Sequence, residues 1–330
     1  MELVTRIADV PVRGTGNIIA IGKWDGVHLA HQAILQALVA EARRVGGQSV
    51  AIGFHPLPMQ VLRPDVAPPM LQTLEERAEA MAELGVDVHL ALPFDKELAD
   101  LTPEAFVHQV LVAQLRAQQV MVGFNNTFGR GGKGTAETMR KLCAPLGIPV
   151  HIFHPVRVDG ENVSSTEVRF AVAKGRVQAA ARLLGRPYSL RGTVVHGDKR
   201  GRQLGFPTAN IRLDEGRLLP PHGVYTVRVT VLGEPRQVQP PATVAPRTGP
   251  AHGAMLNLGV RPTVGGTELR CEAHLFDFSG DLYGREVQVE FLEYIRPERA
   301  FPDLDALVAQ LQADERAARE HLARWQGAGG

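Results

Sequence analysis

Residues 17–35 read NIIAIGKWDGVHLAHQAIL in a chain of 330 residues. The run NIIAI is typical of a short buried strand, and an Asp-Gly turn separates it from residues whose apolar positions recur with helical spacing. We therefore predict a strand, a turn and then a helix over about residues 28–45. This unit decides the fold class of the first half, because a strand that leads directly into a helix is the building block of a parallel sheet.

The same alternation of strand and helix continues to about residue 186. Predicted strands cover residues 48–54, 86–94, 119–124 and 148–156, and predicted helices cover 71–85, 102–115 and 134–147. Strands that alternate with helices of this length indicate parallel crossover units with helices on both faces of the sheet. We therefore expect an α/β parallel-sheet domain over residues 1–186.

The pattern changes in the second half of the chain. From Tyr188 onward, apolar residues alternate with period two in runs such as GVYTVRVTVL (223–232) and REVQVEFLEYI (285–295), without helices between them. This indicates a small antiparallel β-barrel over residues 187–330, closed by a C-terminal helix that begins near Leu304. The Pro-rich stretch 234–253 is expected to be a flexible, solvent-exposed insertion without function between two barrel strands.

Composition excludes several classes of protein. Lys plus Arg is 36 against 35 for Asp plus Glu, a net charge of +1, whereas proteins that bind polyanions usually carry a basic excess. The two cysteines, Cys143 and Cys271, are far apart and form no motif, which argues against a disulfide framework or a structural zinc site. The charged N-terminal residues and the lack of a long apolar run predict a cytoplasmic protein with no membrane partner.

His28 and His31 are three residues apart, so both imidazoles lie on one face of the predicted helix. A zinc site would need a third protein ligand, which no HExxH pattern or neighbouring cysteine supplies. Binding of a phosphoryl group fits better, since the free N–H groups and the dipole of a helix N-terminus favour an anion there. Packing of a helix face remains the alternative.

The segment SSTEVR (164–169) opens a second helix of interest. Ser164, Ser165 and Thr166 are good N-cap residues whose hydroxyl and amide groups face any bound anion, and Arg169 lies one turn further on. A plain capping box formed by a serine and Glu167 would explain the pattern without a ligand.

The most distinctive segment is HGDKRGRQLGFPTAN (196–210). Its glycines allow the backbone to approach a ligand closely, and its basic residues supply charge. Thr208 and Asn210 follow a proline and offer oxygen atoms that suit Mg²⁺. A turn with exposed basic residues is the alternative.

Further along, Glu272 lies in an alternating strand with Ala273 on the other face, where its carboxylate could accept a proton from a substrate hydroxyl. A surface position is the commoner role for such a residue.

The first half, with HxxH after its first strand and SSTxxR after its last, resembles the nucleotidyltransferase superfamily. The whole chain resembles the bacterial bifunctional riboflavin kinase/FMN adenylyltransferase family. The resemblance rests on GKWDGVHLAHQ (22–32), SSTEVR (164–169), GRPYSLRGTVVHGDKRGRQLGFPTAN (185–210), NLGVRPT (257–263) and EAHLFDFSGDLYG (272–284). It implies that the barrel transfers the γ-phosphoryl group of ATP to riboflavin, giving FMN. The first module would then transfer AMP from ATP to FMN, giving FAD and pyrophosphate, and Mg²⁺ would serve as cofactor.

The resemblance also implies roles for individual residues. In the first module, His28 and His31 match the histidines that stabilise the α-phosphoryl group, and Asn125 stands where the family has Asn or Asp. The 164–169 motif matches the ATP-phosphate motif. In the barrel, Glu272 matches the general base on the ribityl 5′-hydroxyl, and Thr208 and Asn210 match the Mg²⁺ ligands. The remaining kinase residues, from the flap over the nucleotide and the motif that follows it, are Gly197, Lys199, Gly201, Gly205, Phe206 and Pro207.

The first half departs from the family pattern at three positions. Ala30 stands where the family has glycine, Leu57 where it has histidine, and Asn126 where an aromatic residue is common. These departures motivate a second hypothesis, a riboflavin kinase whose adenylyltransferase module has degenerated. A third is a non-enzymatic regulator that binds flavin or RNA, because small barrels often bind oligonucleotides. The expected partners are riboflavin, FMN and ATP, without nucleic acid.

Overall fold

The computed structural model describes residues 1–11, 13–197, 201, 204–263 and 266–327. Two compact units make up the chain. Unit 1 comprises Met1–Ser165 with Val238–Pro246, and unit 2 comprises Thr166–Gln237 with Arg247–Gly330. The helices just before residue 186 therefore group with the barrel, and the functional boundary at residue 186 stays a prediction.

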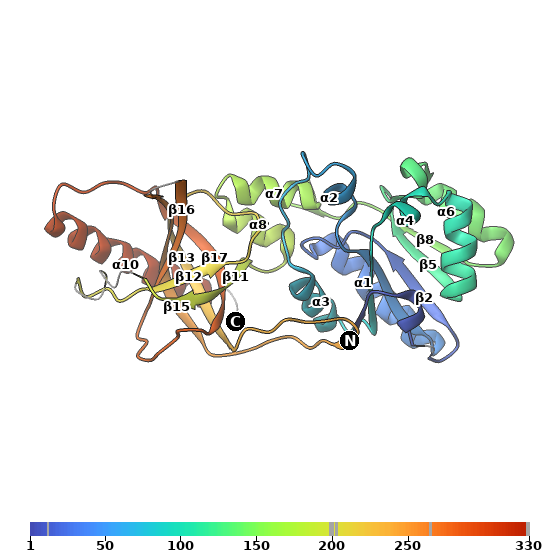
Figure 1. Ribbon diagram of the computed structural model, residues 1–330, viewed down its shortest axis with the longest axis horizontal. Helices are drawn as coiled ribbons and strands as arrows, with labels where there is room; N and C mark the ends of the chain where they lie inside the picture. The colour runs from blue at the N-terminus through green and yellow to red at the C-terminus, as the bar shows by residue number, and fades with distance from the viewer. Residues whose placement is uncertain (12, 198–200, 202–203, 264–265, 328–330) are drawn as a thin grey trace. The chain divides into compact units, whose positions relative to one another are not determined.

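Unit 1 is built on a sheet with the strand order β14-β1-β4-β3-β2-β5-β8. Strands β2, β5 and β8 of this sheet are labelled in Figure 1. Its neighbouring strands pair in parallel except that β14 is antiparallel to β1. The strands are β1 (Glu2–Val4), β2 (Asn17–Ile21), β3 (Gln48–Phe54), β4 (Val88–Leu92), β5 (Ala117–Gly123), β8 (Val150–Phe153) and β14 (Ala242–Thr243). The predicted α/β parallel sheet is confirmed, although the sequence analysis did not predict β1 or β14.

Helices cover both faces of this sheet, which is why β2 is buried along its whole length. Ile18 and Ala20 pack on one side with α1, while Ile19 and Ile21 pack on the other with η2 and α6. The larger helices are α1 (Leu29–Val45), α3 (Leu74–Glu83), the π-helical η2 (Phe106–Gln114) and α6 (Ala136–Cys143).

Short elements complete unit 1. They are η1 (Ile7–Asp9), α2 (Pro58–Leu62), α4 (Lys96–Asp100), α5 (Pro103–Ala105), η3 (Arg130–Gly132), η4 (Ala144–Leu146), β6 (Thr127–Phe128), β7 (Gly134–Thr135), β9 (Arg157–Val158) and β10 (Glu161–Asn162). The predicted helix over 102–115 is present as α5 followed by η2, so it is wound more loosely than an α-helix from Phe106 to Gln114.

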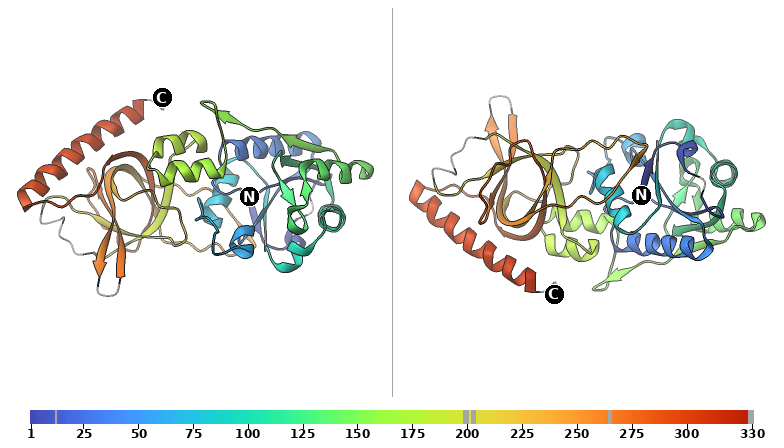
Figure 2. Two further views of the ribbon diagram at one scale, coloured as in Figure 1. Left: turned by 90° about the horizontal axis from the view of Figure 1, so that it is seen from above. Right: turned by 90° about the horizontal axis from the view of Figure 1, so that it is seen from below.

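Unit 2 is a closed antiparallel barrel with the strand order β11-β12-β16-β15-β13-β17, seen as a ring in Figure 2. Its strands are β11 (Tyr188–Val195), β12 (Ala209–Leu213), β13 (Gly223–Gly233), β15 (Ala251–Thr263), β16 (Gly266–Leu275) and β17 (Glu286–Arg296). Two helices, α7 (Ser165–Ala173) and α8 (Val177–Leu184), precede the barrel, and α10 (Leu304–Gly327) packs against β13, β15 and β17. The predicted barrel and C-terminal helix are confirmed.

The Pro-rich excursion differs from the prediction. Part of it, Val238–Pro246, belongs to unit 1, where β14 pairs with β1 in the register Glu2↔Thr243 and Leu3↔Ala242. Only 3 % of Val244 is exposed. The expectation of an unstructured segment was wrong here, because the open edge of β1 supplies hydrogen-bond partners that composition does not reveal. The expectation of exposure was wrong only for Val244, since the other residues of this part are exposed or half-exposed.

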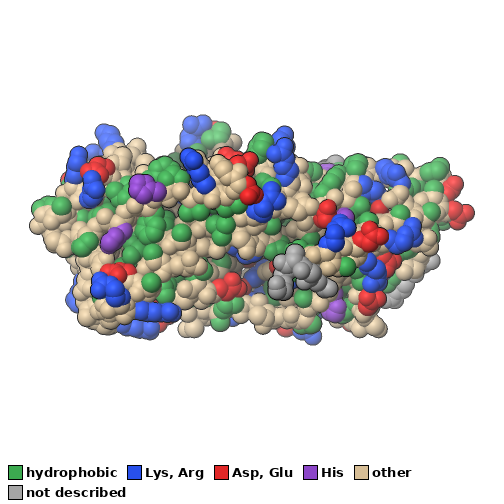
Figure 3. Space-filling model, turned by 180° about the vertical axis from the view of Figure 1, so that it is seen from behind, with side chains coloured by type: hydrophobic (Ala, Val, Ile, Leu, Met, Phe, Trp, Pro, Cys, Tyr) green, Lys and Arg blue, Asp and Glu red, His purple; other side chains and the backbone are tan. Residues whose placement is uncertain are grey.

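No helix in the described part of the chain is long and apolar enough to cross a membrane. On the face shown in Figure 3, basic side chains lie among acidic ones, as the near-zero net charge predicts.

Candidate active sites

The first candidate site lies where β2 ends and α1 begins. Trp24, Gly26 and Val27 all have positive φ angles, so the chain turns sharply before it enters the helix. His28 is the N-cap of α1, and its Nδ1 accepts a hydrogen bond from the backbone N–H of His31 at 3.3 Å. An imidazole that accepts at Nδ1 carries its proton on Nε2. The cap therefore places the proton of a neutral His28 on Nε2.

The two histidine rings stack on each other, with centroids 3.6 Å apart and planes inclined by 16°. The rings of Trp24 and His31 meet in a T-shaped arrangement, with centroids 5.2 Å apart. Burial lowers the pKa of His31 well below its ordinary value, and the nearby His28 and Arg77 lower it further. His31 is therefore neutral at pH 7, and the pair offers directed hydrogen bonds rather than two positive charges.

Asp25 ties neighbouring segments to this turn. Its buried carboxylate accepts hydrogen bonds from the backbone N–H groups of Leu71, at 3.1 and 3.2 Å, and Gln72, at 3.2 Å. Its backbone oxygen accepts a hydrogen bond from Ser165 Oγ at 2.8 Å. The start of the SSTEVR segment therefore lies next to the turn that carries His28.

The positions of the other residues predicted for this site follow from the strands and helices that carry them. Asn125 is exposed in the turn after β5, which pairs in parallel with β2, so it lies at the same edge of the sheet as the start of α1. Ser164 immediately precedes α7, and Thr166 and Arg169 lie in its first turns. Ala30 is half-buried in the first turn of α1, and Leu57 is buried as the N-cap of α2.

Sequence reasoning missed a group of buried polar residues beneath this turn. Arg77 of α3 is completely buried, and its Nη1 donates to the backbone oxygen of Phe54 at 3.3 Å. Its Nε and Nη2 have no hydrogen-bond partner in the part of the chain that the structure describes. His89 is also fully buried, and burial, with Arg77 and His55 nearby, lowers its pKa to about 3. Arg77 lies close enough to His31 and to His89 to lower the pKa of both, so buried polar groups adjoin His31.

The second candidate site lies on one face of three neighbouring barrel strands. Glu272 of β16 pairs with Asn210 of β12 on one side and with Asn257 of β15 on the other. Its Oε1 accepts a hydrogen bond from Arg270 Nη2 at 2.7 Å. Ala273 is fully buried on the other face, so the predicted alternation of this strand is confirmed.

The glycines before β12 allow the backbone to pass close to these residues. An added Cβ at Gly197 would collide with the side chain of Asn210, and one at Gly201 would collide with the backbone oxygen of Phe206. Gly205 has a φ of +84°, which favours glycine. Lys199 lies outside the described residues.

The end of this segment is anchored by packing. The ring of Phe206 is buried with its centroid 5.4 Å from that of His274, whose Nδ1 lies 2.7 Å from the backbone oxygen of Pro207. Thr208 follows directly and leads into β12. The structure therefore brings Asn210 and Glu272 onto adjacent strands and holds Thr208 just before them.

The donors of this second site suit Mg²⁺ only in part. Thr and Asn supply neutral oxygen ligands, and Glu272 supplies a carboxylate on the neighbouring strand. Among the described residues, no cluster of His, Cys, Asp or Glu could hold a metal ion by itself. Mg²⁺ usually completes its coordination with substrate phosphates and water, so this donor set fits an ion that arrives with ATP.

Comparison with known proteins covers both units. A family model described as FAD synthetase matches residues 11–167, and one described as riboflavin kinase matches residues 184–322. The bifunctional riboflavin kinase/FMN adenylyltransferase of Escherichia coli (strain K12) is 39% identical over 305 residues, 92% of each chain. The proteins of the same name from Listeria monocytogenes and Bacillus subtilis are 37% and 34% identical over 93% and 92% of this chain, and 93% and 91% of their own.

Among solved structures, the chain is similar to the crystal structure of a macrolide-efflux protein from Streptococcus pneumoniae. The TM-score is 0.82 at 32% sequence identity, and the match covers 97% of this chain and 99% of that one.

Proposed function

The chain belongs to the bifunctional riboflavin kinase/FMN adenylyltransferase family, and on that premise we propose how its residues perform the two reactions. The enzyme phosphorylates riboflavin to FMN with ATP, and it adenylylates FMN to FAD with release of pyrophosphate. Because both modules match, the comparisons favour this function over a kinase with a degenerate first module and over a non-enzymatic regulator.

In unit 1, a phosphate oxygen of FMN attacks the α-phosphorus of ATP, and pyrophosphate leaves. His28 donates from Nε2 to the α-phosphoryl oxygens, where negative charge builds in the transition state, and His31 supports it from the next turn. The hydrogen bond from His31 N–H to His28 Nδ1 carries this assignment, because it fixes the imidazole tautomer before the substrate arrives.

The remaining adenylyltransferase assignments follow the 164–169 motif, of which Thr166 and Arg169 are counted with unit 2. The hydroxyl and amide groups of Ser164, Ser165 and Thr166 hold the ATP phosphates at the start of α7, and Arg169 pairs with them. Asn125 contacts the nucleotide from the turn after β5. No covalent intermediate is needed, so catalysis consists of positioning and charge stabilisation.

In the barrel, Glu272 accepts the proton of the ribityl 5′-hydroxyl as that oxygen attacks the γ-phosphorus of ATP, and ADP leaves. Thr208 and Asn210 would hold Mg²⁺, which would neutralise charge on the ATP phosphates. The pairing of Asn210 with Glu272 supports this assignment, because it keeps a metal ligand and the base side by side. The backbone at Gly197, Gly201 and Gly205 covers the nucleotide.

The functional boundary between the modules stays at about residue 186, in keeping with family matches that end at residue 167 and begin at residue 184. A cytoplasmic location and the absence of nucleic-acid and membrane partners also stay predictions.

The two reactions are tested together by incubating the protein with riboflavin, ATP and MgCl₂ and separating the flavins by chromatography. FMN followed by FAD is expected, and chelation of Mg²⁺ by EDTA is expected to stop both steps until the ion is restored. FMN alone would mean that unit 1 is inactive, and neither product would refute the assignment. Product formation that persists in EDTA would remove Mg²⁺ from the mechanism.

A further inference from the structure

A short segment of the barrel's sequence completes the sheet of unit 1. Val238–Pro246 lies in the chain between barrel strands β13 and β15, yet it is part of unit 1, where β14 forms the edge of the sheet beside β1. The backbone N–H of Val244 donates to the oxygen of Met1 at 2.8 Å, and the amino group of Met1 donates to the oxygen of Val244 at 3.2 Å. We call Val238–Pro246 the strap.

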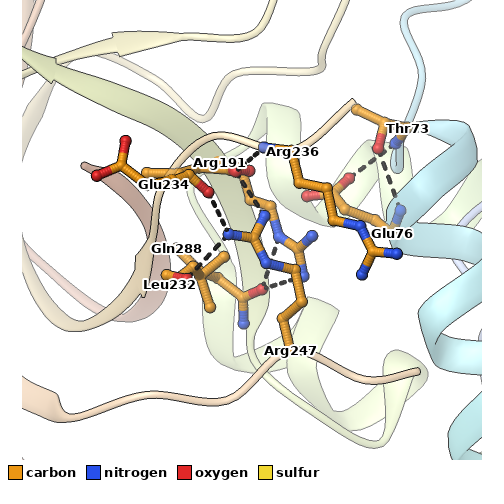
Figure 4. A network of polar contacts seen from close by, with 9 residues as sticks. Thr73, Glu76, Arg191, Leu232, Glu234, Arg236, Arg247 and Gln288 are labelled. Atoms are coloured by element: carbon orange, nitrogen blue, oxygen red, sulfur yellow. Dashed lines mark hydrogen bonds and ion pairs between the residues drawn. The ribbon is translucent and has the colours of Figure 1, made fainter. Parts of the chain in front are cut away.

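The barrel holds the chain on both sides of the strap. Arg247, just after it, donates from Nη2 to the backbone oxygens of Leu232 and Glu234, both at 2.9 Å, so the two ends of the excursion are joined (Figure 4). Arg247 Nη1 also forms an ion pair with Glu286 at 2.5 Å, and both side chains are largely buried. The excursion is therefore a closed loop of defined length rather than a free tether.

Within unit 1, the strap contributes Val244 to a small apolar cluster, and the partly buried Val238 packs against the same cluster. Val244 is buried there with Leu3 of β1, Leu74 and Ala78 of α3, and Ala91 of β4. Leu74 and Ala78 are four residues apart and lie on one face of α3. Val244 therefore packs in the cluster that seats α3 on the edge of the sheet.

Another face of α3 borders the adenylyltransferase site. Arg77 reaches from α3 to the backbone oxygen of Phe54 at the end of β3, and it lies close enough to His31 and Asp25 to interact with both. The residues just before α3, Leu71 and Gln72, donate their backbone N–H groups to Asp25. A shift of α3 would therefore move groups that hold the turn carrying His28.

We propose that Val244 is a positioning residue for FMN adenylylation, because it seats α3 and so holds Asp25 and Arg77 beneath the two histidines. The inference rests on the proposed role of His28 and His31. It means that a loop of the kinase barrel completes the adenylyltransferase module, so that this module reaches its active geometry only when the strap is in place.

The test uses the full-length chain and its two activities. Val244→Asp places a charge in the apolar cluster, whereas Thr243→Asp places the same charge on the exposed neighbouring position. Below the melting temperature of each variant, Val244→Asp is expected to lower kcat for FAD formation from FMN by about tenfold or more, since small displacements of catalytic groups are costly. FMN formation from riboflavin is expected to stay within about twofold, and Thr243→Asp is expected to leave both rates unchanged.

Amide hydrogen exchange supplies a readout that does not depend on activity. Val244→Asp is expected to speed exchange in α3 and β1 while the barrel strands keep their protection. If Val244→Asp unfolds unit 1, the milder variant Val244→Ala is measured in its place. A folded Val244→Ala protein with a lower kcat for FAD formation and faster exchange in α3 supports the proposal.

Unchanged FAD formation in a folded Val244 variant, or an equal loss of both activities, would overturn the proposal. If the unaltered protein makes no FAD, the proposed function fails, and exchange in α3 still tests the coupling between the strap and α3.

Discussion

Replacement of His28 separates its two roles, as the N-cap of α1 and as a hydrogen-bond donor to substrate. His28→Ala removes both, because alanine has no side-chain acceptor for the N–H of His31. His28→Asn restores a good N-cap but offers no imidazole Nε2–H at the substrate. A comparison of the two variants therefore isolates the catalytic contribution.

The expected magnitudes follow from the geometry. The cap hydrogen bond is long, at 3.3 Å, so its loss in His28→Ala should cost about 0.5–1 kcal/mol, the lower half of the usual range. For a unit of this size that corresponds to a fall in melting temperature of a few degrees, at about 2–4 °C per kcal/mol. Loss of one preorganised donor to a developing oxyanion should lower kcat by about 10²–10³.

The assay measures FAD formed from FMN and ATP at saturating flavin, together with thermal unfolding and, as an internal control, FMN formed from riboflavin. Both variants should lose adenylylation by the same large factor and keep kinase activity. Only His28→Ala should melt earlier. Adenylylation by His28→Asn within about threefold of the unaltered rate would show that His28 only caps the helix, and the proposed transition-state role would be refuted.

Further predictions concern the barrel, the module boundary and pH. Glu272→Gln should lower FMN formation by about 10²–10⁴ while added FMN is still converted to FAD; normal phosphorylation of riboflavin would exclude Glu272 as the base. A fragment of residues 187–330 should make FMN but no FAD. A fragment of residues 166–330 should melt at a higher temperature, because α8 packs on β11 and β17 and buries Leu183 and Leu184, each worth about 1.5–3 kcal/mol; equal melting temperatures would contradict this. Because the pKa of His89 is about 3 in the folded chain and near 6.5 when unfolded, protons bind the unfolded state preferentially between these values, and stability should fall as pH drops from about 6.5 towards 3. Urea unfolding at pH 7.5 and pH 5 should show a smaller loss on acidification for His89→Leu, and an identical loss would exclude this contribution.

The folded chain bears out predictions that depend on local pattern. The strand at Asn17–Ile21 and the helix at Leu29–Val45 follow from apolar periodicity, and the alternation of Glu272 with Ala273 follows from the period of a strand. Periodicity is a property of neighbouring residues, so it can be recognised without knowing what each element packs against. For the same reason, the sequence predicts His28 and His31 on one face of a helix start.

Local sequence patterns could not predict the burial of Arg77. An arginine in a charged helix is expected to face solvent, since burying a guanidinium is costly. Here the backbone oxygen of Phe54 and the nearby charge of Asp25 accommodate it, and these groups come from other strands and turns. The two orphaned nitrogens of Arg77 therefore arise from packing that only the folded chain creates.

By itself, the sequence determined a parallel α/β module followed by an antiparallel barrel, and the motifs at residues 22–32, 164–169 and 196–210. Tertiary structure alone decided that Val238–Pro246 completes the sheet of unit 1 and that Asn210 lies beside Glu272. The physical reason is that a strand pairs where another strand offers backbone N–H and C=O groups without partners and where an apolar pocket accepts its side chains. For Ala242 and Val244 these lie at Leu3 and Met1, at the N-terminus and far away in the sequence, where no local pattern can point.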